Sequence, residues 1–146
     1  MLVIDYKFQY LFADKPNLKL ERITKEKILE FITANDIELD CKQARLCVPI
    51  IDRLYRKMLV GVRFTEIGVD DNLICDGHHR YLASLLAQYP ISRKPAIKTS
   101  ADIIVPWMSV EYDEFDWDTA LKIRMLNEQD ALYNDIALER LLELLK

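Results

Sequence analysis

Residues 62–90 read VRFTEIGVDDNLICDGHHRYLASLLAQYP, and this stretch decides the fold. Apolar and polar side chains alternate over residues 62–69, two aspartates at 70–71 signal a turn, and residues 73–75 return to β-strand character. This pattern predicts a β-hairpin. From residue 76 to Pro90 the apolar residues recur at helical spacing, which predicts a helix directly after the hairpin.

A cluster of polar residues, Asp76-Gly77-His78-His79-Arg80, lies where the second predicted strand meets this helix. The first turn of a helix has free backbone N–H groups and a partial positive charge, which attract anions. Gly77 lets the backbone approach a ligand, Arg80 is a bidentate donor suited to phosphate, and the histidines can donate to phosphate, exchange protons or bind a metal. The sequence therefore predicts phosphate contacts from Gly77, His78, His79 and Arg80. The alternative is a structural turn, in which Asp76 is the helix N-cap and Arg80 pairs with an acid of the C-terminal part.

This junction, followed by an apolar helix that contains Ala83, resembles the phosphate-binding signature of the ParB/sulfiredoxin superfamily in its DGHHR form. The resemblance covers residues 20–105. It implies an α+β fold, with a small mixed sheet and surrounding helices, and a nucleotide or other phosphate-bearing ligand, with Mg²⁺, at Gly77–Arg80. The sequence departs from the superfamily at two positions: His78 replaces the sulfiredoxin cysteine, and Leu82 replaces the second arginine of the partition-protein box. Neither sulfiredoxin chemistry nor a chromosome-partition role is therefore expected.

The sequence also offers candidates for catalysis. An enzyme of phosphoryl transfer or nucleotide hydrolysis needs a carboxylate as base or metal ligand. Asp76, Glu30 and Glu66 are the candidates, beside His78 and His79; for Glu30 and Glu66 a solvated surface acid is the simpler interpretation. A metal-assisted nuclease or phosphodiesterase that uses His78, His79 and Asp76 is an alternative function.

The remaining elements are predicted from capping and periodicity. A helix follows the N-cap Thr24 and ends near Asn35, and a second helix begins or kinks at Pro49 and stops at Gly61. Further predicted elements are a strand over residues 2–12, a strand over residues 95–110 interrupted by Pro106, and two helices after Asp116.

Charge is distributed unevenly along the 146 residues, whose net charge is −4. Up to Ser100 there are 16 basic and 13 acidic residues, whereas from Ala101 onward there are 4 basic and 11 acidic ones. We expect a single domain, with residues 1–110 as the core and residues 111–146 as an acidic helical extension. The net acidity argues against binding of extended nucleic acid, which needs a basic surface.

Acidic and aromatic residues alternate over residues 111–118. The simpler interpretation is a loop whose aromatic rings anchor on the core while its acids face water, with Asp116 or Asp118 capping the next helix. A second interpretation makes the protein a non-enzymatic interaction or regulatory module, whose acidic region binds a basic protein partner. A basic cluster before the motif is expected to pair with this region, within the chain or in a homodimer; its members are Arg53, Arg56, Lys57 and Arg63.

The three cysteines, Cys41, Cys47 and Cys75, are odd in number and form no CxxC pair. A disulfide framework is therefore not expected, and a reducing cytoplasm is the natural compartment. No apolar run approaches the roughly 18 residues of a membrane span, so no membrane association is expected. Trp107 and Trp117 are expected to anchor in the core.

Overall fold

The computed structural model describes residues 20–146, so the strand predicted over residues 2–12 lies outside the described residues. The fold is mixed α+β, as expected. The elements in chain order are α2 (Lys25–Ala34), β1 (Arg45–Cys47), α3 (Val48–Leu59), β2 (Ile67–Asp70), β3 (Leu73–Asp76), α4 (His78–Ala87), β4 (Arg93–Pro95), the 3-10 helix η1 (Trp107–Ser109), β5 (Glu111–Asp113), α5 (Ala120–Tyr133) and α6 (Leu138–Leu144).

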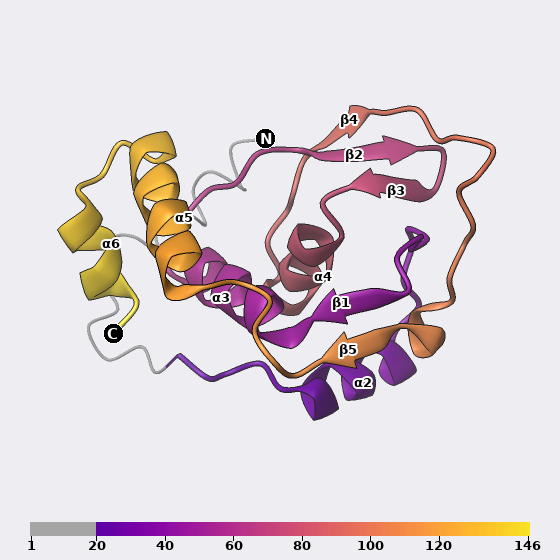
Figure 1. Ribbon diagram of the computed structural model, residues 1–146, viewed down its shortest axis with the longest axis horizontal. Helices are drawn as coiled ribbons and strands as arrows, with labels where there is room; N and C mark the ends of the chain where they lie inside the picture. The colour runs from indigo at the N-terminus through magenta and orange to yellow at the C-terminus, as the bar shows by residue number, and fades with distance from the viewer. Residues whose placement is uncertain (1–19) are drawn as a thin grey trace.

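The strands form two small sheets. In the three-stranded sheet, ordered β3-β2-β4, strands β2 and β3 are an antiparallel hairpin and β4 runs parallel to β2. The second sheet is the parallel pair of β1 and β5, in which Arg45 lies opposite Glu111. Helix α4 lies between the two sheets, and the C-terminal helices α5 and α6 lie at the far end of α3 (Figure 1). The hairpin prediction is confirmed, although strand pairing begins at Ile67 rather than at residue 62.

Both predicted helix starts before the hairpin are confirmed. The Thr24 side chain accepts a hydrogen bond from the Lys27 amide and caps α2, which ends at Asn35. Pro49 lies in the first turn of α3, where no intrahelical N–H donor is needed. Gly61 follows the end of α3 with φ 92°, a backbone conformation that favours glycine.

The main core forms where α3 packs on α4. Ile51 and Met58 of α3 are buried there, together with Leu82 and Ala83 of α4. Burial of such side chains supplies most of the stability of a domain of this size. The packing of α3 against α4 therefore fixes the position of the β3–α4 turn.

The strand predicted over residues 95–110 is wrong. Val105 forms an isolated bridge to Cys41, and its amide donates to the Cys41 carbonyl over 2.7 Å. Pro106 has no N–H to continue a ladder, and Ile103 and Ile104 are exposed. Strand β4 ends at Pro95, where the predicted strand begins, and β5 begins at Glu111, directly after its end.

The two C-terminal helices are confirmed, but their approach differs from the prediction. Residues 111–113 form strand β5 rather than a loop. The N-cap of α5 is Thr119, which accepts from the Lys122 amide, and neither Asp116 nor Asp118 takes that role. Helices α5 and α6 pack back on the end of α3 through a buried cluster of Val60, Val62, Ala131 and Leu141.

None of the helices within residues 20–146 has the length and apolar character needed to cross a membrane. The three cysteines carry free thiols, and Cys41 and Cys47 are buried.

Candidate functional site

The β3–α4 turn is built around Gly77. Its φ is 96°, and a Cβ added there would lie 2.6 Å from Ile67 Cγ2 and 2.8 Å from Arg80 Nη2. Glycine is therefore required both by the left-handed backbone and by the Arg80 side chain that folds back over it. Gly77, and not Asp76, is the N-cap of α4, and no side chain of residues 20–146 caps this helix. The N–H groups of the first turn thus remain available to a ligand.

His78 points into the protein and is only 2% exposed. Its Nε2 accepts a hydrogen bond from the Lys42 amide over 3.2 Å. In the neutral ring the proton therefore resides on Nδ1, which makes this atom a donor. Nδ1 is buried and has no partner within residues 20–146.

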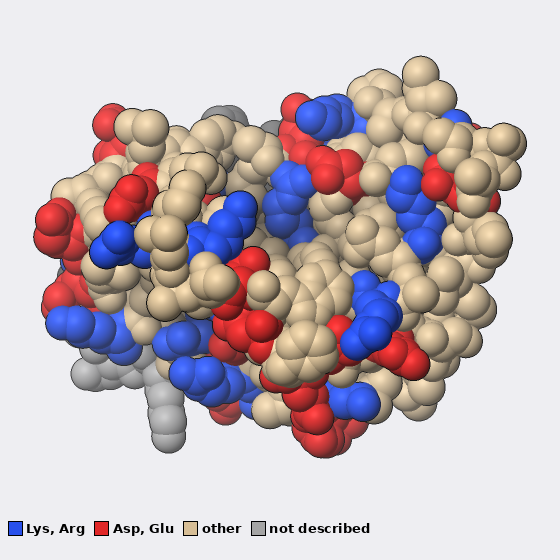
Figure 2. All heavy atoms as spheres, in the orientation of Figure 1, with Lys and Arg blue, Asp and Glu red and all other residues tan. Residues whose placement is uncertain are grey.

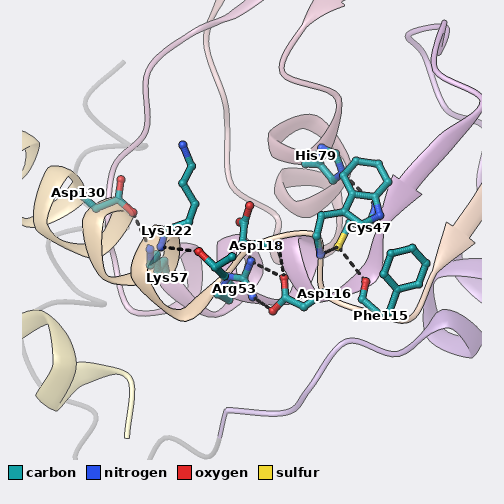
Figure 3. Close-up of polar contacts among 11 residues, drawn as sticks. Cys47, Arg53, Lys57, His79, Phe115, Asp116, Asp118, Lys122 and Asp130 are labelled. Carbon is teal, nitrogen blue, oxygen red and sulfur yellow. Dashed lines mark hydrogen bonds and ion pairs between the residues drawn. The ribbon is translucent and has the colours of Figure 1, made fainter.

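His79 is held in the same way by a different segment. Its Nε2 accepts from the Cys47 amide over 3.0 Å, so its Nδ1 is also a donor. The ring packs edge to face against Trp117, with centroids 5.4 Å apart. Trp117 is 41% exposed and is fixed by a hydrogen bond from its indole N–H to Asp113, so the expectation that it anchors in the core is wrong. Figure 3 shows His79 beside Cys47 at this end of the site.

Burial lowers the pKa of both histidines to about 4. Repulsion from the protonated form of His79 and from the Lys42 ammonium lowers the pKa of His78 further. Both rings are therefore neutral at pH 7 and are poor proton exchangers there. A metal ligand needs a free imidazole lone pair, but each Nε2 lone pair already accepts a backbone N–H. This geometry weighs against the metal-assisted nuclease, and no group of three or more His, Cys, Asp or Glu side chains in the described chain is placed to hold a metal ion.

Arg80 is bound to the protein itself. Its Nη1 donates to the Thr65 carbonyl (3.0 Å), the Thr65 hydroxyl (2.7 Å) and the Glu66 carbonyl (3.1 Å). Its Nη2 donates to Asp76 over 3.1 Å. The guanidinium is thus a clamp between the turn and the segment before β2, rather than the free bidentate phosphate donor that the motif predicted. Its ionic partner is Asp76 and not an acid of the C-terminal part.

A cavity of about 450 Å³ opens in front of this turn, and we call it the α4 cavity. Residues 76–80 form one wall, Arg53 and Lys57 of α3 form another, and Leu126 and Asp130 of α5 close it from the opposite side. The space-filling view is hollowed between α5 and the three-stranded sheet, and basic side chains line the hollow (Figure 2). The C-terminal extension therefore contributes one wall of the α4 cavity.

The basic side chains of α3 that line the α4 cavity are already paired. Arg53 binds Asp116 over 2.6 Å and Asp118 over 2.8 Å, and the buried Lys57 binds Asp130 over 2.6 Å (Figure 3). The expected pairing of the basic cluster with the acidic extension within the chain is confirmed for these two residues. The other two members also reach the extension by hydrogen bonds: Arg56 donates to the Leu145 carbonyl, and the Arg63 backbone bonds to the Asn134 side chain.

The candidates for catalysis do not all meet. Asp76, His78 and His79 lie together at the α4 cavity. Glu30 is exposed on α2, and neither it nor Glu66 is among the residues that line the cavity. Sequence reasoning missed the two acids of the extension that line it, Asp118 and Asp130, because nothing in the local pattern places them there.

Comparisons of the chain with family models, with curated proteins and with solved structures found no match. The ParB/sulfiredoxin resemblance therefore rests on the residues of the junction and stays a prediction.

Proposed function

We propose that the protein binds one phosphate group of a small phosphate-bearing ligand, such as a nucleotide, in the α4 cavity. One observation carries the proposal: the uncapped N-terminus of α4 lines a cavity together with two imidazoles whose Nδ1 atoms are donors. Helix N-termini bind phosphate through free N–H groups and the helix dipole. The DGHHR resemblance points to the same turn.

The buried Nδ1 of His78 strengthens the proposal. It is a donor without a partner within residues 20–146, in a side chain that lines the cavity. A buried donor left without an acceptor costs about 1–3 kcal/mol. An anionic oxygen reaching this atom would recover that free energy, and a cationic ligand would not.

The balance of charge at the cavity favours a single phosphate over a polyphosphate. Arg53, Lys57 and Arg80 are each neutralised by carboxylates of the chain. The donors left for a ligand are neutral N–H groups, which suit one monoester rather than the charge of a triphosphate. The same pairing occupies the carboxylates that would hold Mg²⁺, so the proposed binding does not depend on a metal.

The geometry supports binding better than catalysis. With pKa values of about 4, neither histidine serves as a general base that switches near neutral pH. We therefore propose ligand binding rather than phosphoryl transfer or nucleotide hydrolysis.

A titration followed by amide NMR tests the proposal. Inorganic phosphate, AMP and ATP are added separately, with and without Mg²⁺. We expect saturable shifts centred on the amides of His78, His79 and Arg80, and AMP should bind at least as tightly as ATP. The absence of a saturable shift with any of the three probes would overturn the proposal.

A pair of isosteric variants provides the control. Gln43 is exposed and lines the α4 cavity, so Gln43→Glu places a negative charge at its mouth and should weaken phosphate binding several-fold. Gln88→Glu makes the same change at the opposite end of α4 and should leave binding unchanged. Equal affinities of the two variants for phosphate would show that the anion binds outside the α4 cavity.

A further inference from the structure

Helix α5 carries apolar side chains on two opposite faces. On the inner face Leu126 lines the α4 cavity and Ala131 is buried. On the outer face Leu121, Met125 and Leu132 are 57%, 46% and 84% exposed. Helix α5 also carries polar residues, but exposed apolar side chains gathered on one face mark an interaction surface. The outer face of α5 therefore has the composition of an interface.

The three outer side chains lie along one side of α5, with the acidic Glu128 in the turn between Met125 and Leu132. Successive residues of an α-helix are turned by about 100°, so residues 121, 125 and 132 point within about 40° of one another. With a rise of about 1.5 Å per residue, Leu121 and Leu132 lie about 16 Å apart, at the two ends of the stripe. We call these three residues the outer stripe.

Opposite charges flank the outer stripe on one edge. Arg124 and Glu128 lie on the same side of it, the basic residue toward the start of α5 and the acidic residue toward its end. Both are exposed, and neither forms an ion pair with another residue of the described chain. Each therefore has its charge available for a partner.

We propose that the outer stripe is the interface with a second copy of this chain, packed antiparallel about a two-fold axis. Such an axis, passing between the two helices at the level of residues 126 and 127, places Leu121 against Leu132 of the partner subunit and the two copies of Met125 near the centre. The same axis brings the charged edges of the two helices to one side of the interface. Arg124 of each copy then lies beside Glu128 of the partner subunit, which gives two equivalent pairs. This self-complementarity is what an isologous interface requires, and an unrelated partner would not need it.

The proposed dimer is independent of the proposed phosphate site. Leu126 and Asp130 face the α4 cavity from the inner side of α5, whereas the outer stripe faces away from it. One fourteen-residue helix from each copy makes a small interface, so we expect a dissociation constant on the order of 1–100 µM.

Sedimentation equilibrium over about 5–500 µM protein tests the proposal across that range. The mass should rise from the 17.2 kDa of one chain toward twice that value. Leu132→Glu should raise the dissociation constant at least about tenfold by burying a charge, while the fold measured by circular dichroism stays intact because the residue is exposed. Ile97→Glu, at a residue 87% exposed in the loop after β4, is the matched control and should leave dimerisation unchanged. A mass of one chain at every concentration would overturn the proposal.

Charge exchange tests the register. Arg124→Glu and Glu128→Arg should each weaken the homodimer, because each places like charges together on the shared edge. An equimolar mixture of the two single variants should form a heterodimer, in which both pairs of opposite charges are restored. The double variant should dimerise like the original chain. If the mixture associates no better than its components, the antiparallel register is wrong.

Discussion

The β3–α4 turn and the acidic extension are both rich in polar side chains, but they use them differently. The histidines and Arg80 of the turn bond mainly to backbone amides and carbonyls of three other segments. The carboxylates of the extension bond to charged side chains of α3. The polar contacts of the turn therefore depend on the protonation state of two rings, whereas those of the extension depend on opposite charges.

The strongest expected contrast is the response to acid. Unfolded histidines take up protons below about pH 6.5, whereas the folded rings do so only near pH 4. Stability should therefore fall as the pH is lowered through this window, by about 3–4 kcal/mol between pH 7 and pH 5 for the two rings together. Arg53 keeps the pKa of Asp116 below 3.8, so this contact of the extension should persist at pH 5.

Urea unfolding at pH 7 and pH 5 measures this difference. His79→Gln keeps an acceptor for the Cys47 amide but cannot take up a proton, so it should remove about half of the pH dependence. Unchanged stability of the original chain between pH 7 and pH 5 would show that the rings are not held neutral.

The next effect probes the extension. In Asp130→Asn the buried Lys57, whose side chain is 5% exposed, loses its ionic partner. An uncompensated buried charge costs about 3–5 kcal/mol, and the partial exposure of Asp130 reduces the expected loss to about 2–3 kcal/mol. Denaturant unfolding measures it.

A double variant separates charge from packing at this contact. Lys57→Met combined with Asp130→Leu removes both charges and should recover most of the stability, as apolar replacements of buried ion pairs do. A double variant as unstable as Asp130→Asn would indicate that this contact stabilises the protein through side-chain packing rather than through charge.

The smallest of the three effects probes the backbone of the turn. Gly77→Ala combines a positive φ with the short contacts to Ile67 and Arg80, and should lower the free energy of unfolding by about 2 kcal/mol. Gly68→Ala is the control, because its Cβ would approach Ala96 Cβ to 3.1 Å without a positive φ. Its loss, measured by the same unfolding curves, should be under about 1 kcal/mol. Equal losses would mean that the left-handed conformation of Gly77 contributes little.

Local chemistry predicted the elements whose signals lie within a few residues. Thr24 capped its helix, Pro49 opened the next one, and the two aspartates at 70–71 joined the hairpin. Strand β5 escaped prediction because it is short and acidic, and it forms only where its partner β1 is already in place. Residues 95–110 were predicted as a strand but form mostly a loop. Their strand propensity is not enough without a neighbouring strand to pair with.

The sequence predicted where the residues of the candidate site lie, but not which hydrogen bonds they form. The spacing of the junction placed Gly77, His78 and His79 beside one cavity, as the structure has them. That Arg80 would clamp the backbone, and that both Nε2 atoms would be occupied, depends on the Lys42 and Cys47 amides, which come from distant segments. No local pattern encodes such contacts.

The parallel pair of β1 and β5 has a consequence for the time at which this protein becomes native. The side chains of Arg45 and Asp113, which are hydrogen-bonded to one another across it, are 68 positions apart. At about 5–20 residues per second on the ribosome, β1 waits about 3–14 s for its partner strand, and contacts that close long loops are slow to form. During that interval Arg45, Arg53 and Lys57 emerge without their acidic partners, so the nascent chain is a basic molecule. Its net charge becomes negative only when its last third has been synthesised.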